Sequence, residues 1–184
     1  MRSLTVFTAA TLIVLLCTGC GPQAKKARLL KQADTYFAAG EFEKAEIEYK
    51  NALAAVPMDP QAIGRLGLVY FEQGRQMRAF SYLSKAAELQ PANLEIKLKL
   101  GFMQAAGGKI NEARDAALAV LAQKPQDPEA PLLLVETSVQ PKQIDEARQR
   151  LQSLPAPVVN SAPVIAALGM LELRQRKLTE AEAT

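Results

Sequence analysis

Two cysteines near the N-terminus, Cys17 and Cys20, are the residues whose type and spacing most directly suggest chemistry. A Cys-x-x-Cys pair serves in thiol–disulfide exchange or supplies two of the four ligands of a zinc ion. The chain has no other cysteine and no histidine, so it lacks a second pair of zinc ligands and the usual general base near neutral pH. We therefore expect no metal site, no cofactor and no redox role for this pair.

Paired carboxylates are the other groups that general acid–base catalysis uses. Glu43 with Glu46, and Glu180 with Glu182, stand close together in segments that also carry Lys or Arg. Mixed charges of this kind are typical of the solvated face of a helix. We expect these carboxylates to be solvated and the chain not to be an enzyme.

The segment that holds the two cysteines is composed like a targeting sequence. Arg2 gives it a positively charged start, and residues 4–16 are apolar except for Thr8 and Thr11. This run is shorter than the roughly 20 residues that span a bilayer, but it suits the hydrophobic region of a secretory signal peptide. An uncleaved anchor helix and an ordinary secretion signal fit the same composition.

The end of the apolar run, Gly19-Cys20, resembles the lipobox of bacterial lipoproteins, in which a small residue precedes the lipidated cysteine. The resemblance implies a diacylglyceryl group on Cys20, a signal peptide at residues 1–19 and a short tether at residues 20–25. Cys17 stands where the lipobox prefers Leu, which is a departure from the pattern. Two or three acyl chains on one residue would anchor the protein stably to a membrane.

The residue after Cys20 is Gly21 and not Asp. In the lipoprotein sorting rule, Asp at this position retains the protein in the inner membrane. Gly21 therefore implies an outer-membrane lipoprotein that faces the periplasm. The inner membrane is the alternative, because the rule differs between bacterial groups.

The overall composition is that of a helical globular protein. Apolar residues make up 49% of the chain and charged residues 22%, and the net charge of +3 is small. Lys25, Lys26, Arg28 and Lys31 form the only basic cluster, whereas nucleic-acid-binding proteins usually carry a sustained basic face. We expect no nucleic-acid partner.

Beyond the N-terminal segment, the sequence repeats with a period of 34 residues. Independent series in one register indicate tandem copies of one supersecondary unit. The series are Ala45, Ala79, Ala113, Ala147 and Ala181; Leu66, Leu100, Leu134 and Leu168; Pro57, Pro91 and Pro125; and Gly40, Gly74 and Gly108.

Each copy has the pattern of two helices joined at a Gly turn. In the second copy Ile63, Leu66 and Tyr70 share one helix face, and the pattern breaks at Gly74. Gly inside a helix costs about 1 kcal/mol relative to Ala, so its recurrence there suggests close packing. The glycines expected to pack in this way are Gly67, Gly101 and Gly169.

This pattern resembles the tetratricopeptide repeat (TPR). The resemblance implies an all-α solenoid of antiparallel helix pairs over residues 26–184, with repeats that begin near residues 26, 60, 94, 128 and 162. The family motif is matched in full by the second copy, at Leu66-Gly67, Tyr70, Ala79, Leu83, Ala86 and Pro91.

The last two copies depart from the motif. Pro131 and Pro141 interrupt the fourth copy, where Ser138 replaces the Tyr. The fifth copy is incomplete, because Thr184 falls within its expected second helix. We expect the sequence to be a fragment of a longer protein; the alternative is that the last half-repeat frays.

A TPR solenoid presents a concave groove lined mainly by the first helix of each repeat. In one subclass Lys and Asn in this groove grip a C-terminal carboxylate; here Leu30 and Asp34 stand at the first two of those positions, so we expect no such clamp. An aliphatic and aromatic groove fits an apolar or amphipathic segment of a protein or peptide partner. Packing of the phenylalanines within the solenoid is an equal alternative. The positions carried over by register are Leu30, Asp34, Phe37, Gly64, Leu68, Phe71, Leu98, Phe102, Leu132, Glu136, Met170 and Leu173.

Together the two resemblances imply a lipid-anchored periplasmic adaptor that mediates protein–protein interactions. Lipoproteins of this kind resemble the pilotins of type IV pili, outer-membrane assembly factors and the TPR lipoproteins linked to exopolysaccharide export. The alternatives are an N-terminal TPR module of a longer envelope enzyme and a cytoplasmic adaptor with an uncleaved anchor.

Overall fold

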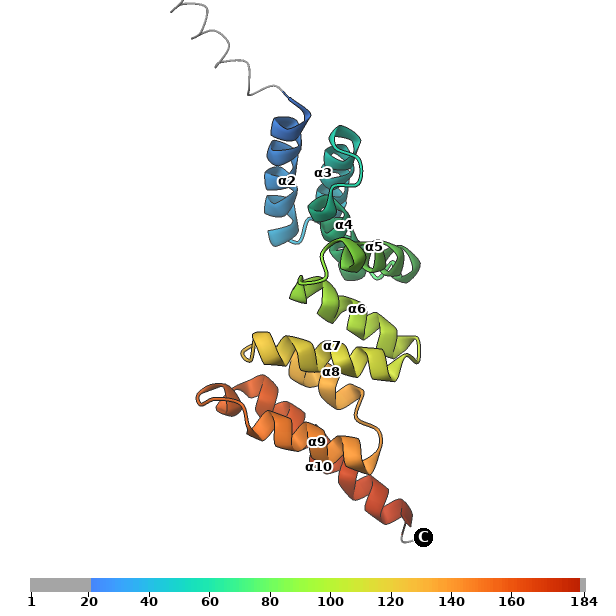
Figure 1. The fold of residues 1–184 in the computed structure, drawn as a ribbon, viewed down its shortest axis with the longest axis vertical. Coiled ribbons are helices and arrows are strands. Elements are labelled where there is room, and N and C mark those ends of the chain that lie inside the picture. The colour runs from blue at the N-terminus through green and yellow to red at the C-terminus, as the bar shows by residue number, and fades with distance from the viewer. Residues whose placement is uncertain (1–20, 183–184) are drawn as a thin grey trace, which may run out of the picture. The chain divides into compact units, whose positions relative to one another are not determined.

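The chain folds into α-helices joined by short turns (Figure 1). The computed structural model describes residues 21–182, with side chains through Lys177. Cys17, Cys20 and the expected signal peptide lie outside the described residues. Within the described part every regular element is helical, which confirms the predicted all-α fold. In that same part we find no helix with the length and apolar character needed to cross a membrane.

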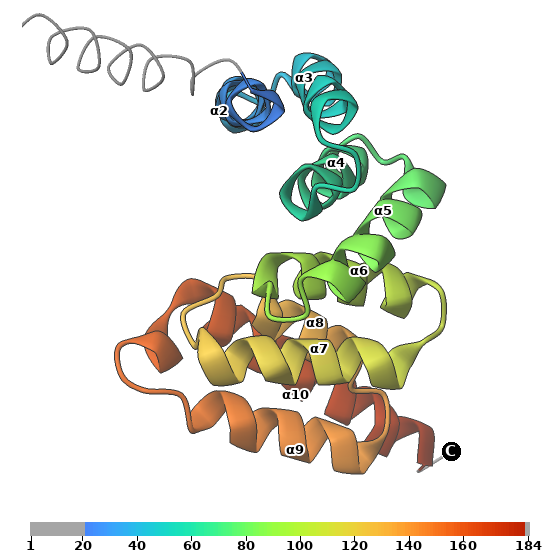
Figure 2. The same cartoon turned by 45° about the horizontal axis from the view of Figure 1, so that its top comes forward.

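The first of two compact units ends at Leu89. Each of its helices packs against the next one along the chain, and Figure 2 views α2 and α4 nearly end-on. Pro22 is the first residue of α2, a position that suits its fixed φ angle. Residues 22–25, which the sequence assigns to the tether, form the first turn of α2. The helices are α2 (Pro22–Ala38), α3 (Phe42–Ala55), α4 (Pro60–Glu72) and α5 (Gln76–Leu89).

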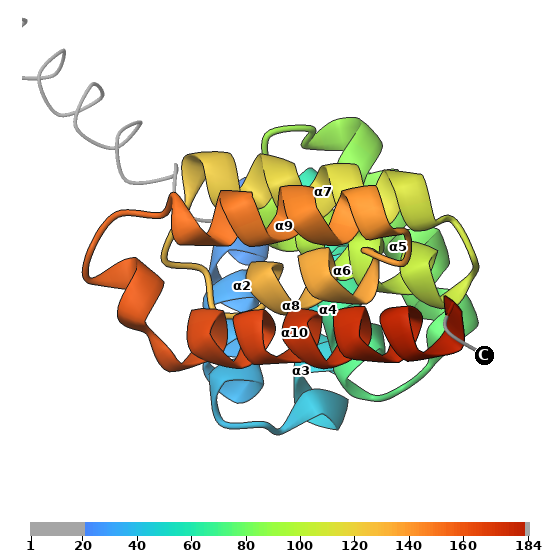
Figure 3. The same cartoon turned by 90° about the horizontal axis from the view of Figure 1, so that it is seen from below.

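The second unit begins at Gln90. Within it α8 contacts α6, α7, α9 and α10, and α9 also packs on α10 (Figure 3). Its core includes the fully buried side chains of Leu121, Leu133, Ile144 and Leu171. The elements are α6 (Leu94–Ala106), α7 (Ile110–Gln123), α8 (Ala130–Glu136), α9 (Pro141–Gln152), the short 3-10 helix η2 (Val158–Asn160) and α10 (Ala162–Glu182).

The recurring glycines form the turn inside each of the first three repeats. Gly40, Gly74 and Gly108 have φ angles of 74°, 68° and 79°, a region that Gly adopts without steric cost. In each turn the next residue donates its backbone N–H to a carbonyl five residues earlier, at 2.8 to 2.9 Å. This bond is typical of a helix that ends in a left-handed residue, and it confirms the predicted turns.

A second periodic signal, which the motif comparison missed, marks where each new repeat begins. Asp59, Asn93 and Asp127 stand 34 residues apart, two residues after each repeat-ending Pro. Their side-chain oxygens accept the backbone N–H groups of Ala62, Ile96 and Ala130 at 2.9 to 3.2 Å. Such a cap satisfies an N–H group that has no partner within the helix. The pattern Pro-x-Asp/Asn would have located the starts of α4 and α6, whose N-cap residues are Asp59 and Asn93, whereas α8 begins three residues after Asp127.

The small residues of the motif lie where helices approach closely. Ala45, Ala79, Ala113 and Ala147 are fully buried. A Cβ atom at Gly67 would lie 2.8 Å from Leu83 Cδ2. This confirms the packing reason predicted for that glycine.

The same test separates the other two glycines. A Cβ atom at Gly101 would lie 2.8 Å from Leu133 Cδ2 and 3.0 Å from Ala116 Cβ, so the prediction is confirmed there as well. A Cβ atom at Gly169 would meet no described atom within 4 Å, so the prediction is wrong there.

The fourth repeat is shortened but intact. Its first helix, α8, has only seven residues, and Pro131 and Pro141 lie in the first turns of α8 and α9. Proline is tolerated there because the first N–H groups of a helix have no partner within it. Arg174 compensates for the early end of α8, donating to the carbonyl oxygens of Val135 at 2.6 Å and Ser138 at 2.7 Å.

The fifth repeat differs from its prediction. We expected a turn and a second helix there, but α10 runs without a break from Ala162 to Glu182. Arg176 occupies the register of the turn glycines, so the residue that permits a left-handed turn is missing.

Candidate partner-binding surface

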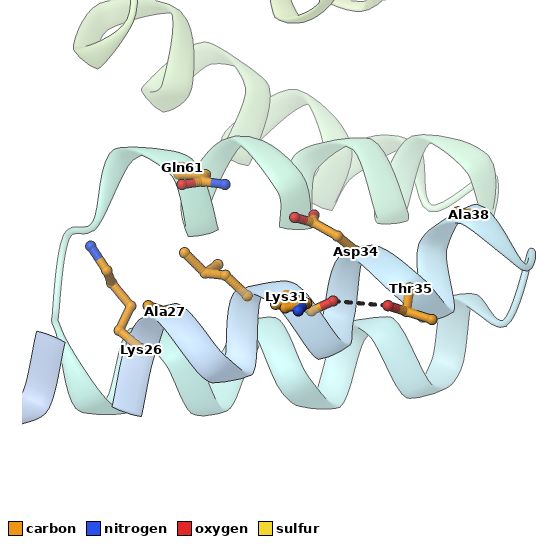
Figure 4. Close-up of a pocket in the computed structure, with 8 residues that line it drawn as sticks. Lys26, Ala27, Lys31, Asp34, Thr35, Ala38 and Gln61 are labelled. Atoms are coloured by element: carbon orange, nitrogen blue, oxygen red, sulfur yellow. Dashed lines mark hydrogen bonds between the residues drawn. The ribbon is translucent and has the colours of Figure 1, made fainter. Parts of the chain in front are cut away.

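A solvent-open hollow of about 700 Å³ lies on the first helices of the first two repeats. Figure 4 shows that its labelled side chains come from α2, with Gln61 facing them from α4. The lining contains two positively charged side chains and one negatively charged side chain, together with apolar ones. The lining residues are Lys26, Ala27, Leu30, Lys31, Asp34, Thr35, Ala38 and Gln61.

One end of the hollow is held by an ion pair across the first repeat boundary. Lys26 Nζ lies 2.8 Å from Asp59 Oδ2, while the other oxygen of Asp59 caps α4. Burial raises the pKa of Asp59, but the hydrogen bonds from Lys26 and from the N–H of Ala62 outweigh that effect and lower the pKa below its ordinary value. Asp59 is therefore ionised at neutral pH, and it positions both Lys26 and the start of α4.

The only carboxylate in this lining, Asp34, already has partners in the fold. The Tyr49 hydroxyl donates to Asp34 Oδ1 at 2.6 Å, and Arg65 Nε lies 3.4 Å from the same oxygen. Arg65 also lies over the ring of Phe37, 5.9 Å from its centre. Asp34 thus holds Arg65 in place, and its own negative charge is balanced by that cation.

Most of the predicted groove leucines are buried between helices and do not face a groove. Leu30, Leu68 and Leu98 are 3 to 5% exposed, and Gly64 is also buried. Leu30 reaches the hollow with a small part of its surface. The surface is therefore more polar than the expected aliphatic and aromatic groove, because the leucines of α2, α4 and α6 serve the interior.

The predicted groove phenylalanines are partly buried as well. Phe37 makes an edge-to-face contact with Phe42, with 5.6 Å between ring centres. Phe102 packs against the core of the second unit, and Phe71 is half-buried. For Phe37 and Phe102 these contacts favour packing within the solenoid.

The predicted positions of the last two repeats are exposed. Leu132 and Glu136 on α8, and Met170 and Leu173 on α10, all present side chains to solvent. Leu173 is 62% exposed and Met170 45%. These residues lie in the second unit and do not join the hollow of the first.

Sequence reasoning missed Lys26, Lys31, Thr35 and Gln61 as lining residues. It carried family positions over by register, whereas lysine side chains reach the rim from neighbouring positions on α2. The helical spacing of Lys31 and Thr35, four residues apart, was the available signal. The Thr35 hydroxyl donates a hydrogen bond to the Lys31 carbonyl oxygen at 3.0 Å (Figure 4).

Glu46 is not solvated, so that prediction is wrong. It is 8% exposed and accepts hydrogen bonds from Lys50 at 2.6 Å, Arg75 at 3.0 Å and the Tyr70 hydroxyl at 3.1 Å. Burial raises its pKa, but the bonds from Lys50 and Tyr70 and the charge of Arg75 together lower the pKa below its ordinary value. With these three donors, the Glu46 carboxylate links α3 to α4.

The matching link of the second unit uses a buried arginine. Arg114 is 8% exposed and donates to the Ser138 hydroxyl at 2.6 Å and to Glu146 Oε2 at 2.9 Å. This link joins α7 to α9. Glu43 is exposed as expected, whereas the side chains of Glu180 and Glu182 lie outside the described residues. In the described part of the chain no three His, Cys, Asp or Glu side chains gather as they would around a metal ion.

Solved structures of other proteins share this arrangement of helices. A TPR protein from Parabacteroides merdae superposes with a TM-score of 0.65 at 18% identity, over 86% of this chain and 63% of that one. PilF of Pseudomonas aeruginosa superposes with a TM-score of 0.65 at 18% identity, over 88% of this chain and 74% of that one. Thus the chain spans less than two thirds of the Parabacteroides protein.

A human relative was solved with a ligand. The second TPR domain of human RPAP3, in complex with the HSP70 peptide SGPTIEEVD, superposes with a TM-score of 0.55 at 20% identity, over 65% of this chain and all of that domain. No curated protein sequence matches the chain.

Sequence models of the family cover most of the described residues. One model of the tetratricopeptide repeat matches residues 30–93, and another matches residues 70–130 and 108–171. Repeats of this kind typically form a protein–protein interaction scaffold without catalytic activity. With its glycine turns, buried alanines and capped repeat starts, this chain belongs to the tetratricopeptide repeat family.

Proposed function

We propose that the protein is a lipid-anchored adaptor of the bacterial cell envelope that binds a protein or peptide segment with its TPR surface. Cys20 carries the lipid, and Gly21 directs the protein to the outer membrane, facing the periplasm. The pathways it serves are envelope assembly, secretion or exopolysaccharide export. The lipobox sequence Gly19-Cys20 supports the anchor, and the hollow on α2 and α4 supports the binding role.

The observation that carries the binding role is the chemistry of this hollow. Lys26 and Lys31 offer donors, and Gln61 offers both a donor and an acceptor. Ala27, Ala38 and the accessible edge of Leu30 offer apolar contact. An amphipathic segment satisfies both kinds of surface better than a wholly apolar one.

The anchor is tested by replacing each cysteine in turn. In cells fed labelled palmitate, we expect label on the natural protein and on Cys17→Ser, and none on Cys20→Ser. Cys17→Ser is the matched control, because it changes the same residue type three positions away. Label that persists on Cys20→Ser would overturn the anchor.

The membrane assignment is tested by Gly21→Asp. We expect the natural protein to sediment with outer-membrane fractions on a density gradient and Gly21→Asp to move to the inner-membrane fractions. Identical distributions of the two proteins would contradict the sorting assignment while leaving the anchor intact.

The binding surface is tested with a photo-crosslinking amino acid in the anchored full chain. Placed at Thr35 or Gln61, in the hollow, it should crosslink to one protein in living cells. Placed at Ala54, which is exposed on α3 and does not line the hollow, it should not. Equal crosslinking from both places, or none from the hollow, would contradict this binding surface.

A further inference from the structure

The start of α2 carries an uncompensated basic face. Residues 21–33 contain four basic side chains and no acidic one. Lys26 is neutralised by Asp59, but Lys25, Arg28 and Lys31 are exposed, and no described carboxylate lies within ion-pair distance of them. Three positive charges therefore face solvent within two turns of helix.

These three side chains share one side of the helix. Residues three apart on an α-helix are offset by about 60°, so Lys25, Arg28 and Lys31 lie within an arc of about 120° and span about 9 Å along the axis. Gln32 lies on the same arc, between Lys25 and Arg28. The arrangement is a compact cationic strip along α2.

Helix stability does not explain the strip. The first turn of α2 has no acidic residue, and the positive end of the helix dipole lies there. A cation such as Lys25 near that end is mildly unfavourable. Glu41 with Lys44 and Lys85 with Glu88 show the compensated spacing used elsewhere in this unit.

The position of the strip points to its ligand. Gly21 caps α2, so the strip begins five residues after Cys20. A lipid on Cys20 would hold Lys25 within about one Debye length of the membrane surface, which is roughly 8 Å at physiological salt. We propose that this basic face of α2 binds the anionic phospholipid headgroups of the membrane in which Cys20 is anchored, an inference that rests on the lipid anchor proposed above.

The expected strength follows from the number of charges. Each Lys or Arg near an anionic membrane surface favours the bound state by a factor of about five, so three favour it by about 100-fold. Lys31 also lines the hollow, so headgroup binding brings the hollow to the membrane surface.

The test uses tryptophan as a reporter, because the chain contains none. The full chain with Gln32→Trp is isolated from membranes and reconstituted into vesicles of phosphatidylcholine alone or of phosphatidylcholine with an equal part of phosphatidylglycerol. We expect the tryptophan emission to shift to the blue only with phosphatidylglycerol. The shift should disappear at about 1 M salt, where the Debye length is about 3 Å.

A charge-reversed variant and a matched control isolate the strip. Lys25→Glu, Arg28→Glu and Lys31→Glu together should abolish the blue shift, moving the equilibrium of α2 toward solution by at least 100-fold. Lys109→Glu, Lys142→Glu and Arg176→Glu make the same change of net charge on exposed residues of the second unit and should retain it. Absence of the shift, or its survival in the first variant, would overturn the proposal. A shift caused by an acidic peptide and not by vesicles would also overturn it.

The anchor is read separately, from the mass of the isolated chain. A lipidated chain whose tryptophan does not respond overturns headgroup binding and leaves the anchor intact. A chain without lipid would overturn the anchor. In that case the tryptophan emission of the same chain mixed with the vesicles decides whether the basic face of α2 binds headgroups.

Discussion

The polar links inside the two units occupy the same repeat position with opposite charge. Glu46 and Arg114 stand two periods apart, each 8% exposed on the second helix of its repeat. Glu46 accepts from the Tyr70 hydroxyl, and Arg114 donates to the Ser138 hydroxyl, again two periods apart. Ser138 replaces the motif Tyr where the buried group has changed from an acceptor to a donor.

The first and third repeats bury a polar group at this register position, whereas the second repeat has the exposed Phe80 there. The position is therefore available to a buried polar group but does not require one. Arg114 is paired with Glu146, whose register equivalent in the first unit is Arg78. The buried group and this one partner position are therefore inverted in charge, whereas Lys50 and Arg75, the partners of Glu46, have the neutral equivalents Leu118 and Gln143.

The largest expected effect comes from reversing the buried charge. Glu46→Arg would place a cation beside Lys50 and Arg75, and Arg114→Glu would place a carboxylate beside Glu146. We expect each variant to lose about 3–5 kcal/mol of unfolding free energy, because it leaves an uncompensated buried charge. Urea unfolding followed by circular dichroism measures the loss.

A second substitution sharpens this result. Glu46→Arg combined with Arg78→Glu copies the Arg114–Glu146 pair into the first unit. We expect a favourable coupling of about 0.5–3 kcal/mol between the two changes in a double-mutant cycle. Strictly additive losses of unfolding free energy would show that the residue at position 78 does not determine which charge is tolerated at position 46.

A smaller effect distinguishes the register-equivalent glycines. Gly67→Ala and Gly101→Ala meet neighbouring side chains and should cost about 1–3 kcal/mol in overpacking, more than the roughly 1 kcal/mol gained in helix propensity. Gly169→Ala meets nothing and should stabilise by up to about 1 kcal/mol. Thermal unfolding midpoints measure all three, and a shift of the same sign in all would contradict the packing difference.

The smallest effect is in the acid dependence of stability. The folded-state pKa values of Glu46 and Asp59 in the first unit, and of Asp127 in the second, are lowered. Each contributes stability that is present above its unfolded pKa, near 4, and is lost as pH falls through the folded pKa. The urea midpoint should therefore fall between about pH 5 and pH 3.

Substitution of the two links separates their parts in this acid loss. Glu46→Gln should make the decline shallower, because one shifted carboxylate is gone. Arg114→Gln, the control, should leave the steepness unchanged, since arginine stays charged throughout. An unchanged slope in Glu46→Gln would remove Glu46 from the acid response.

Sequence predicted the helices and turns well because their causes are local. Gly40, Gly74 and Gly108 supply positive φ angles, and helical spacing identifies the buried faces. The end of the fold was harder, since Arg176 replaces the turn glycine and α10 continues.

The surface was predicted less well, because exposure depends on what neighbouring helices cover. Leu30, Leu68 and Leu98 stand at groove register but are buried, and Glu46 has the spacing of a surface residue but is buried too. Only the packed arrangement decides between these outcomes.

The contact of Arg174 with the end of α8 makes the folding of α8 depend on α10. It joins residues 36 to 39 positions apart, whereas most helices of the chain rely on the next element along the sequence. The carbonyl groups at the end of α8 are therefore satisfied only when α10 has folded against it. We therefore expect α8, α9 and α10 to unfold as one cooperative block, where a regular solenoid would lose one repeat at a time.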